Sequence, residues 1–560
     1  MTAPQDLAAK LAAARMLPHA PDPASFRDHA SIPAMLAAQA AARPDQEALV
    51  FLDDDGGRAA WTYAGLADAV ARVAGFLRDR GVARGHRVGT MAHNHADTVL
   101  QMLAVWSVGA VLVPVNVGED DDRVTYILDS SGARLAFVRD EYLARLESLR
   151  GSLPQLETLV VSGEAAPGHV SFADALAHAP AADLAADPDD EALIVYTSGT
   201  TGHPKGVALT QGNLLVDAAQ ITRWHRLTPG ERMMCVLPIH HVNGTVVTLV
   251  TPFSYGGTAV LHRRFRTERF LPALADERIG VVSVVPTLLS FLLQAGASTD
   301  GLDLSAFRHI VCGAGPLTVE LALQFQDALG LRIVHGYGLS ETTCYSCFLP
   351  IDLDDATHRG WLGDHGFPSI GCAIPSNAMA IHDPEGRPVP DGERGEIVIR
   401  GHNVMTGYDR NPQANADAFA HGWFRSGDEG FVLKGDDGND YFFITGRLKE
   451  LIIRGGVNVS PLEIDEVLMN LPGVRAGVSV GFENDMYGEE IGAYVVLDDG
   501  ATEDADAVLA ACAAALPHHK RPKVVVFGTE VPVTSTGKYQ RNRLKPLFRE
   551  WRGAQFRKSG

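Results

Sequence analysis

The chain has 560 residues, with 48 Lys and Arg against 68 Asp and Glu, which gives a formal net charge of −20. This length allows several domains and a large buried core. An acidic balance of this size argues against nucleic acid and anionic membrane surfaces as partners. Positive charge is concentrated at the end of the chain, where residues 518–560 contain eleven Lys and Arg and only two acidic residues.

Six cysteines in a chain of this length are too few for a disulfide scaffold. Cys344 and Cys347 form a C-x-x-C, but no second pair lies at zinc spacing, so reduced thiols are favoured over a redox or metal site. The N-terminus lacks the continuous apolar run of a signal peptide, and no apolar run is long enough to span a bilayer. We therefore expect a cytoplasmic protein without a transmembrane segment.

Apolar runs and helical spacing alternate along most of the chain. After a loose or weakly helical leader over residues 1–30, helices are predicted at 32–41 and 64–80, the second ending at Gly81 as a C-cap residue. Short apolar runs between helical stretches predict strands at 48–52, 87–91, 110–114 and 135–138. This alternation indicates an α/β architecture with largely parallel sheets.

The pattern changes from about residue 387, where Gly- and Asp-rich turns separate short strands such as GEIVIRG and YFFITGR. A helix is then predicted at Pro461–Met469, followed by strands at 476–481 and 492–498. The segment from about residue 450 onward is long enough to form a separate small domain.

The strongest local signal is YTSGTTGHPKG at residues 196–206, directly after an apolar strand. Its small residues let backbone N–H groups approach phosphate oxygens, its hydroxyls add donors, and Lys205 adds a positive charge. The spacing is not that of a Walker loop. A Ser/Thr-rich turn is the alternative, but the composition favours a phosphate site that comprises Thr197, Ser198, Gly199, Thr200, Thr201 and Gly202.

This segment resembles the phosphate loop of the adenylate-forming enzymes, which include acyl-CoA synthetases, stand-alone adenylation domains and firefly luciferase. Further motifs follow in the order of that superfamily across about residues 30–545. The resemblance implies an α/β fold with a large N-terminal AMP- and acid-binding domain over 31–448, which has mixed and parallel sheets, flanking helices and a distorted β-barrel subdomain. It also implies a small mobile α+β C-terminal domain over 449–560.

The motif HGYGLSETT at residues 335–343 carries the next part of the resemblance, which implies that Tyr337 stacks on adenine and Thr342 contacts the α-phosphate. Glu341 and Thr201 are implied to hold Mg²⁺, an ion that takes one or two carboxylates and keeps waters. A lone Glu at a helix start would otherwise be only a dipole partner. Small residues that permit close approach of a flat purine complete the nucleotide wall: Gly313, Ala314, Gly315, Gly336 and Gly338.

Two paired motifs are implied to bind the ribose and to mark the hinge. Asp428, in WFRSGD, would accept both ribose hydroxyls, and Arg447, in ITGR, would donate to the ribose or a phosphate. An isolated Asp after Gly is most often a turn residue, so the flanking match carries this assignment. Lys449 stands where the superfamily has its hinge between domains.

The C-terminal part supplies two further implied sites. Arg454, Gly455 and Gly456 match the segment that lines the pantetheine tunnel, although a plain β-turn would explain the glycines equally well. Lys538, in PVTSTGK, matches the lysine that enters the active site during adenylation and bonds the carboxylate and the α-phosphate.

The segment LPIHHVNG at residues 237–244 resembles the acyl-pocket segment of the superfamily, with His241 as the matching histidine and His240 in place of the usual aromatic residue. We expect a strand here, whose alternation would point the two histidines to opposite faces and exclude a metal pair. A medium-chain, an aromatic or a short functionalised acid all fit a pocket predicted to comprise His241, Val242, Asn243, Gly244, Val285, Thr287, Gly313, Tyr337, Thr343 and Cys344.

The resemblance implies a two-step reaction with ATP, Mg²⁺ and coenzyme A. A carboxylate first attacks the α-phosphate, and the thiol of coenzyme A then displaces AMP, with Lys205, His241, Glu341, Thr342 and Lys538 as the catalytic residues. One alternative is transfer to a carrier-protein pantetheine or another nucleophile. A catalytically silent homologue is a second alternative, but it would be expected to have lost Lys538, Glu341 or Asp428. A homodimer is a further prediction.

Overall fold

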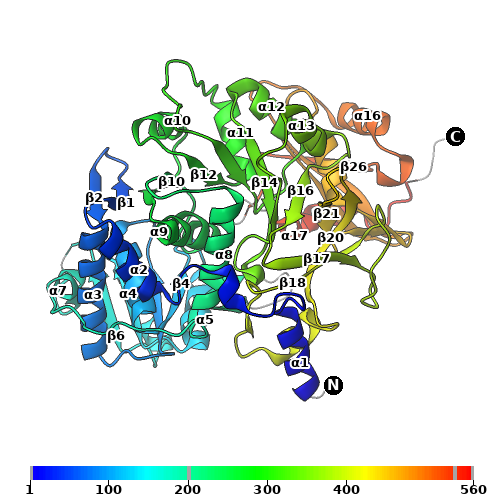
Figure 1. Ribbon diagram of the computed structural model, residues 1–560. Helices are drawn as coiled ribbons and strands as arrows, with labels where there is room; N and C mark the ends of the chain where they lie inside the picture. Colours follow the sequence, from blue (N-terminus) through cyan, green and yellow to red (C-terminus); the bar gives the residue numbers. More distant parts are fainter. Residues whose placement is uncertain (1–3, 165, 198–203, 534–538, 557–560) are drawn as a thin grey trace.

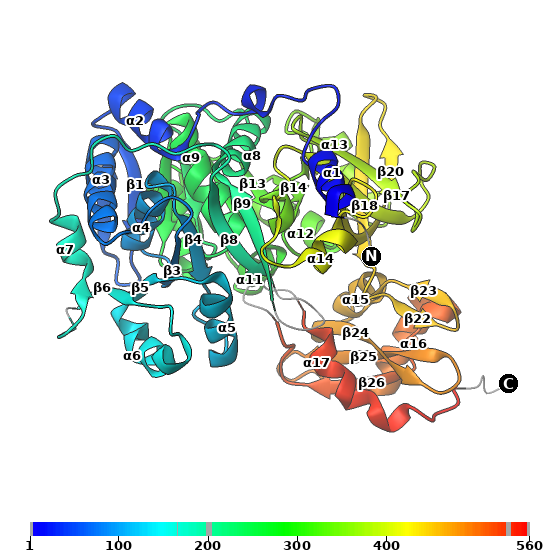
Figure 2. The ribbon, with the colours of Figure 1, turned by 90° about the horizontal axis from the view of Figure 1, so that it is seen from below.

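The computed structural model describes residues 4–164, 166–197, 204–533 and 539–556. Most of the chain forms one large α/β body, and the residues after about 450 form a smaller lobe beside it (Figures 1 and 2). The structure is therefore α/β with mixed sheets, as the sequence predicts.

The first large sheet has eight strands among the described residues. Strands β3 to β6 pair in parallel, whereas β8 and β9 are antiparallel. The central strands are apolar and buried along most of their length, as expected for parallel strands covered on both faces. The strand order is β19 (Gly407–Tyr408), β9 (Lys205–Thr210), β8 (Glu191–Thr197), β4 (Val111–Val115), β3 (Arg87–Met91), β5 (Leu135–Arg139), β6 (Thr158–Ser162) and β7 (Val170–Ser171).

The second sheet has thirteen strands within the described part of the chain, and its two halves differ. One half is parallel apart from the edge hairpin β1–β2, and its order is β14 (Ile333–Tyr337), β13 (His309–Cys312), β12 (Val281–Val284), β10 (Arg232–Cys235), β11 (Thr258–His262), β1 (Glu47–Leu52) and β2 (Arg58–Thr62).

The other half continues from β14 as an antiparallel sheet. Its order is β15 (Cys347–Phe348), β16 (Ser369–Ala373), β21 (Asp440–Arg447), β20 (Phe424–Lys434), β18 (Gly395–Gly401) and β17 (Asn377–His382). The expected barrel is not closed in the residues that the structure describes. Strand β17 pairs with β18 and forms the edge of the sheet, so this region is an open extension.

Helices pack between and around the two sheets. Helix α4 (Ala96–Ser107) contacts β1 of the second sheet and β4 of the first, and so lies between them. The helices predicted near residues 32 and 64 are confirmed as α2 (Ile32–Ala42) and α3 (Tyr63–Asp79). The other helices of this body are α5 (Asp121–Ser131), α6 (Asp140–Leu149), α7 (Phe172–Leu176), α8 (Gln211–Trp224), α9 (Thr251–Tyr255), α10 (Thr267–Asp276), α11 (Pro286–Gln294), α12 (Val319–Leu329), α13 (Asp355–Gly363) and α14 (Pro412–Ala418).

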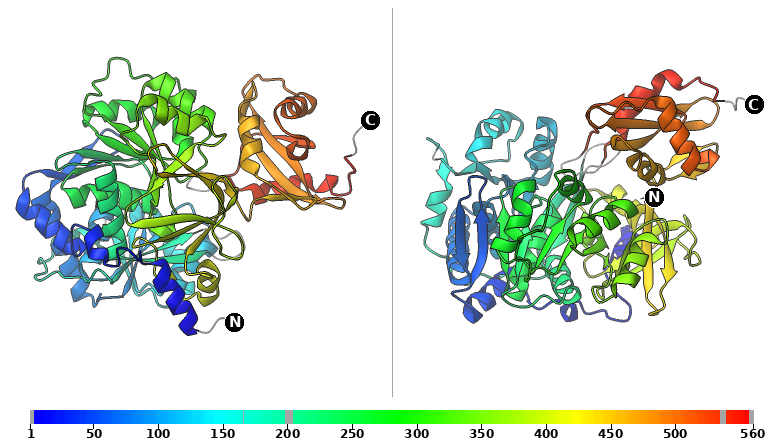
Figure 3. Two further views of the ribbon diagram at one scale, coloured as in Figure 1. Left: turned by 45° about the vertical axis from the view of Figure 1, so that its right-hand side comes forward. Right: turned by 90° about the horizontal axis from the view of Figure 1, so that it is seen from above.

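The residues after about 450 form a small lobe (Figure 3). This lobe has its own apolar cores. Helix α15 begins and ends at the predicted residues, Pro461–Met469. The lobe also contains α16 (Ala505–Ala515), α17 (Arg541–Leu544) and a sheet of β23 (Val457–Val459), β22 (Ile452–Arg454), β25 (Gly488–Leu497) and β24 (Val474–Asn484), with β26 (Val524–Gly528) beside β25.

Helix α15 packs beside β21, and two of its carboxylates make polar contacts with the large body. Glu463 forms an ion pair of 2.8 Å with Arg394, in the loop between β17 and β18. Glu466 Oε1 accepts a hydrogen bond of 3.2 Å from the backbone N–H of Val319, the first residue of α12. A carboxylate at that end of a helix meets unpaired N–H groups and the positive end of the helix dipole.

The N-terminal segment folds against the large body. Residues Pro4–Ala14 form helix α1, which contacts β18, and Ala14 and Leu17 are fully buried. Across the described residues, no helix is both long and apolar enough to cross a membrane.

Candidate active site

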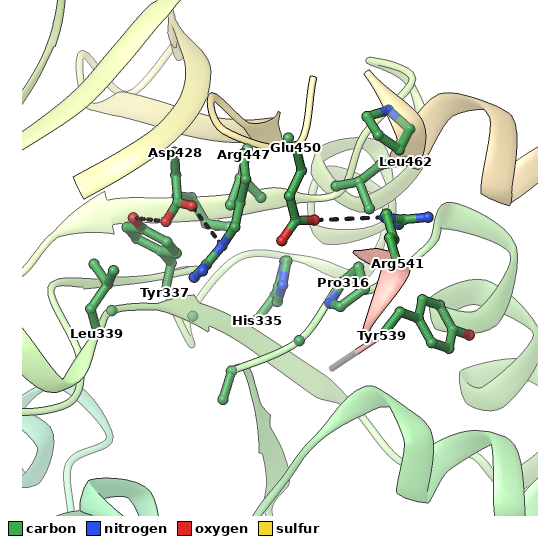
Figure 4. A pocket seen from close by; sticks show the side chains of 18 residues that line it. Pro316, His335, Tyr337, Leu339, Asp428, Arg447, Glu450, Leu462, Tyr539 and Arg541 are labelled. Carbon is green, nitrogen blue, oxygen red and sulfur yellow. Dashed lines mark hydrogen bonds and ion pairs between the residues drawn. The ribbon is translucent and has the colours of Figure 1, made fainter. Parts of the chain in front are cut away.

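A cavity of about 130 Å³ lies where the small lobe meets the large body (Figure 4). Its wall on the large body comes from the loops after β13 and β14 and from the antiparallel half of the second sheet. Its wall on the small lobe comes from α15 and the residues beside α17. The lining residues are Ala314, Gly315, Pro316, His335, Gly336, Tyr337, Gly338, Leu339, Ile370, Asp428, Ile444, Gly446, Arg447, Glu450, Pro461, Leu462, Tyr539 and Arg541.

A chain of hydrogen bonding and ion pairing crosses one side of this cavity. The Tyr337 hydroxyl donates to Asp428 Oδ2 at 2.6 Å, and Arg447 Nε lies 3.1 Å from Asp428 Oδ1 (Figure 4). Asp428 is buried, and its Oδ1 receives no hydrogen bond of good geometry. Burial and the neighbouring Asp428 carboxylate raise the pKa of Tyr337, which stays a neutral donor. A buried carboxylate with a free acceptor position fits the hydroxyls of a ribose.

The backbone of the cavity wall leaves no room for larger side chains. A Cβ on Gly338 would lie 1.8 Å from the carbonyl oxygen of Cys344, and one on Gly336 would lie 2.5 Å from the Phe348 ring. Ala314 has a φ of +64°, in the region that L-residues seldom adopt. These residues let the main chain approach a flat ligand closely, so the cavity fits a purine nucleotide.

Glu341 lies beside the nucleotide cavity on the short helical turn η4 (Ser340–Thr342). The Tyr408 hydroxyl donates to Glu341 Oε1 at 2.9 Å, and the Lys205 ammonium lies over the Tyr408 ring, 4.7 Å from its centre. The described residues contain no cluster of three or more His, Cys, Asp or Glu side chains that could hold a metal ion. One buried carboxylate without such a cage fits Mg²⁺, which takes most of its ligands from water and phosphate.

A larger cavity of about 590 Å³ lies on the other side of the 338–340 segment. Most of its wall is aliphatic or aromatic. The lining residues are His93, Asn94, Val117, Val236, Leu237, Pro238, His240, His241, Val242, Asn243, Arg263, Arg264, Phe265, Val285, Thr287, Leu288, Phe291, Ala314, Gly338, Leu339, Ser340, Cys344, Tyr345 and Val533. We call it the acid cavity, and the first one the nucleotide cavity.

The two cavities share part of their walls. Ala314, Gly338 and Leu339 line both of them. A ligand in one cavity would therefore meet a ligand in the other across small side chains and main chain, and this arrangement suits a reaction between two bound molecules.

The segment with the paired histidines differs from its prediction. His240 lies in a turn rather than a strand, and residues Asn243–Val250 form a π-helical segment, η3. The rings of His240 and His241 are therefore not on opposite faces; their centres are 4.5 Å apart, and both side chains line the acid cavity. Gly244 is needed because a Cβ there would lie 2.4 Å from the Pro238 carbonyl oxygen. Sequence periodicity did not reveal this turn, since the flanking residues are as apolar as a strand.

His240 is an uncharged side chain with spare hydrogen-bonding capacity. Desolvation, with a smaller contribution from His241, holds its pKa well below the ordinary value of histidine. Its Nε2 is buried and makes no hydrogen bond. Asn243, by contrast, is satisfied, because its Oδ1 accepts from Ser283 at 2.8 Å and its Nδ2 donates to the Tyr345 hydroxyl at 3.3 Å.

The residues predicted for the nucleotide and acid sites that the structure describes fall into three groups. Those that line the nucleotide cavity are Ala314, Gly315, Gly336, Tyr337, Gly338, Asp428 and Arg447. Those that line the acid cavity are His241, Val242, Asn243, Val285, Thr287 and Cys344. Residues near the cavities but outside their linings are Thr197, Lys205, Gly244, Gly313, Glu341, Thr342 and Thr343. The hydroxyl of Thr342 bonds within its own turn, where it accepts from Leu339 N at 3.1 Å.

Other predicted residues lie farther away or cannot be located. Lys449 is exposed in the turn after β21, and Gly455 and Gly456, with φ of +58° and +83°, join β22 to β23 as a tight hairpin turn. Arg454 donates to Glu490 at 3.0 Å. Ser198, Gly199, Thr200, Thr201, Gly202 and Lys538 lie outside the described residues.

Several residues of the nucleotide cavity were not predicted. Glu450, Tyr539 and Arg541 line it from the small lobe, and Arg541 Nε lies 3.6 Å from Glu450 (Figure 4). Tyr539 follows Lys538 in the sequence, and that proximity is the signal from which Tyr539 could have been found. The polar groups at the outer part of the acid cavity, His93, Arg263 and Arg264, carry no motif.

Comparison with known proteins agrees with this geometry. Residues 36–409 match the family described as AMP-binding enzyme, and residues 463–538 match the AMP-binding enzyme C-terminal domain. The chain belongs to the AMP-binding enzyme family.

Its relatives in this family include the sulfoacetate–CoA ligase of Cupriavidus necator, 35% identical over 92% of this chain and 97% of that protein. The feruloyl-CoA synthase of an Amycolatopsis species is 35% identical over 88% of this chain and 95% of its own. The ATP-bound structure of MatB from Rhodopseudomonas palustris superimposes with a TM-score of 0.81 at 28% identity, covering 93% of this chain and 99% of MatB. The chain is an AMP-forming acyl-CoA synthetase that uses ATP, Mg²⁺ and coenzyme A.

Proposed function

We propose that the nucleotide cavity and the acid cavity together form the active site of this ligase. The observation that carries the proposal is their shared wall at Ala314, Gly338 and Leu339. The carboxylate of the acid attacks the α-phosphorus of ATP, the new P–O bond forms, and pyrophosphate leaves. Asp428 binds the ribose, and Lys205 and Lys538 offset negative charge as it moves to the leaving group.

Glu341 and Thr201 would hold the Mg²⁺ ion, which when bound offsets charge on the phosphates. The Tyr408 hydroxyl orients the Glu341 carboxylate through its 2.9 Å hydrogen bond. His241 lies in the wall of the acid cavity, where we assign it to the substrate carboxylate.

The second step requires the small lobe to move. We assign domain boundaries at residues 31–448 and 449–560, after the leader of residues 1–30, with Lys449 as the hinge. Lys449 is exposed in a turn, where a change of backbone dihedrals displaces no core side chain. Rotation would bring the Arg454–Gly455–Gly456 hairpin to the adenylate, where the thiol of coenzyme A attacks the acyl carbon and AMP leaves.

We further propose that the substrate is a carboxylic acid with one negative charge and a largely apolar body. The positive side chains in the described wall of the acid cavity are already neutralised: Arg263 lies 2.9 Å from Glu141, and Arg264 lies 2.8 Å from Asp54. His93 has a pKa lowered to about 4, mainly by burial, and is neutral at pH 7. A second anionic group would therefore enter an apolar cavity without a free counter-charge, at a high desolvation cost.

Relatives of this chain act on acids of both kinds. Sulfoacetate and oxalate, named for two relatives, carry two anionic groups, whereas ferulate and indoleacetate carry one on an aromatic body. The apolar wall with Phe265, Phe291 and Leu288 favours the second kind, and a free His240 nitrogen fits a neutral polar substituent such as a phenolic hydroxyl.

The test is pyrophosphate release with a panel of acids at equal concentration. Cinnamate, 4-hydroxycinnamate, phenylacetate and hexanoate represent monoanionic acids, and sulfoacetate, malonate and oxalate represent dianionic ones. We expect the highest kcat/KM among the monoanionic acids, and a dianionic acid at the top of the ranking would contradict the assignment. His240→Phe should lower kcat/KM for 4-hydroxycinnamate by about fivefold or more relative to cinnamate, the loss expected for one hydrogen bond.

The proposal also covers the cellular compartment, the oligomeric state and the acyl acceptor. Transfer to coenzyme A takes place in the cytoplasm, a compartment that fits six cysteines which are all buried and free. Assembly as a homodimer stays a prediction, to be checked by sedimentation. A carrier-protein pantetheine is the alternative acceptor, and competition against coenzyme A tests it.

A further inference from the structure

The chain makes an unusual turn at Thr343, between the two cavities. Thr343 has φ of +65° and ψ of −53°, and the N–H of Cys344 donates to the carbonyl of Thr342 at 2.7 Å. These values describe a γ-turn whose central residue has a positive φ, a rare and strained conformation. The strain is greatest for a β-branched residue such as Thr.

The turn separates two groups of residues with different tasks. Glu341, which we propose to hold Mg²⁺, and Thr342 precede it. Cys344 and Tyr345 follow it and line the acid cavity. A change in the dihedrals of Thr343 would therefore shift one group relative to the other, and would alter the spacing between the two bound substrates.

A buried polar network holds this turn in place. The Thr343 hydroxyl donates to the carbonyl of Asn403 at 2.6 Å, and Asn403 Nδ2 donates to the carbonyl of Tyr345 at 2.9 Å and to Asp217 Oδ1 at 3.1 Å. Asn377 Nδ2 donates to Asn403 Oδ1 at 2.8 Å. We call Asp217, Thr343, Asn377 and Asn403 the turn clamp; the side chain of Asn377 is 7% exposed and the other three are fully buried.

The clamp joins three separate parts of the fold. Asp217 belongs to α8, Asn377 begins β17, and Asn403 follows β18. Burial raises the pKa of Asp217 to about 8, so this carboxyl is kept in an apolar interior at a free-energy cost. Backbone strain persists where the surroundings hold it, and such strain is concentrated at functional sites.

We propose that Thr343, held by Asn403 and Asp217, is a positioning residue that fixes the distance between the phosphate-side residue Glu341 and the wall of the acid cavity. The proposal rests on the proposed function of the two cavities. Adenylation depends on near in-line attack, and a displacement of about 1 Å between reacting groups can cost about a hundredfold in rate. If the turn relaxed, Glu341 and the wall of the acid cavity would each keep their own structure, but the distance between them would change.

The test is Thr343→Gly, because glycine adopts both positive and negative φ without strain. We expect the kcat of acid-dependent ATP–pyrophosphate exchange, measured with the best acid of the panel, to fall by about tenfold or more. The dissociation constant of MgATP should change by less than about threefold, and the thermal midpoint should fall only slightly, because relief of the strain offsets part of the lost hydrogen bond to Asn403 and of the added freedom of the unfolded chain. A kcat within about threefold of the wild type overturns the proposal, and so does a loss of kcat that only follows a loss of folded protein.

Three further variants separate the possible causes. Asp183→Gly relieves a positive φ of +53° at a remote, exposed residue and should leave kcat and binding unchanged. Thr343→Ser keeps the hydroxyl that donates to Asn403, and should rescue most of the rate. Glu341→Gln tests the site itself: full activity of that variant would refute the proposed function, whereas an inactive Glu341→Gln beside a fully active Thr343→Gly would refute the positioning role alone.

Discussion

At the scale of single residues, the site depends on hydrogen bonds from neutral tyrosine hydroxyls to buried carboxylates. Tyr337 and Tyr408 each donate to one carboxylate, Asp428 and Glu341 respectively, and both phenols are buried. A hydrogen bond to a charged group stabilises more than one between neutral groups, so these phenols restrict the orientation of the two carboxylates.

The Tyr408 hydroxyl should matter to metal binding. Tyr408→Phe leaves the Glu341 carboxylate without its 2.9 Å partner, and the Mg²⁺ concentration for half-maximal activity should rise by about five- to thirtyfold. The measurement is a Mg²⁺ titration of pyrophosphate release. Tyr255→Phe, which removes a buried hydroxyl bonded to the Glu231 carbonyl far from the site, is the matched control and should leave the titration unchanged.

Lys538 should be required for the first half-reaction alone. Lys538→Ala is expected to abolish acid-dependent ATP–pyrophosphate exchange and to leave thioester formation from supplied acyl adenylate largely intact. Lys545→Ala is the control from the same lobe, because that exposed ammonium pairs with Glu489 at 3.3 Å. Equal loss of both half-reactions in Lys538→Ala would refute the assignment.

At the scale of elements, the small lobe is held in this arrangement by few polar contacts and is free to change it. Arg394 to Glu463 and Val319 N–H to Glu466 connect α15 with the large body. The ion pair is partly exposed, with Arg394 at 40% and Glu463 at 15%, and surface ion pairs contribute about 1 kcal/mol or less. The small lobe has its own apolar core and docks weakly. It can therefore take up different positions for adenylation and for thioester formation.

The hinge prediction belongs to this scale. Lys449→Pro fixes φ at residue 449 and restricts Leu448 before it, so we expect thioester formation to suffer more than adenylation. Lys449→Ala, which keeps the backbone freedom, is the control. Separate measurement of pyrophosphate exchange and of acyl-CoA formation checks it, and a larger loss in the exchange would contradict it.

Regular elements were predictable from the sequence where apolar spacing and end signals agree. Helix α15 matches its predicted range, and α3 ends before Gly81, whose φ of +77° suits a C-cap residue. The strand predicted around His240 was wrong, because an apolar run of that length fits a strand or an irregular buried segment equally well.

The tertiary contacts of the site could not be predicted from the sequence. Nothing in the local pattern pairs Tyr408 with Glu341, or Asn403 with Thr343, because those bonds join residues more than fifty positions apart. The same holds for Arg541 in the nucleotide cavity, which depends on how the small lobe docks. Motifs identified the loops, and the fold decided which side chains meet.

At the scale of the whole molecule, several histidines are buried, and burial favours their neutral state. Burial is the main cause that lowers the pKa of His262, His335 and His358 to about 4 and that of His309 to about 3. The unfolded chain binds protons at these groups from about pH 6.5 downward, and the folded chain does not until near pH 4. Their contribution to stability is complete above that range and is lost as the pH falls through it.

The resulting prediction is acid sensitivity over a defined range. The thermal midpoint should fall as the pH drops from about 7 to about 5, and His262 alone should account for about 2 kcal/mol at pH 5. His262→Leu removes that titrating group, so the difference between pH 7 and pH 5 should shrink. His519→Gln, at an exposed site, is the control and should keep the wild-type slope. A slope of His262→Leu equal to that of the wild type would refute the assignment.

The shared wall of the two cavities has an evolutionary consequence. Because Ala314, Gly338 and Leu339 are the only described residues that line both spaces, the other described side chains around the acid can be exchanged without touching those that hold the nucleotide. Such a layout is modular: the nucleotide cavity can be kept while the acid cavity changes through substitutions at positions such as 240. New acid preferences can therefore be engineered into this scaffold by altering the distal lining and sparing the three shared positions.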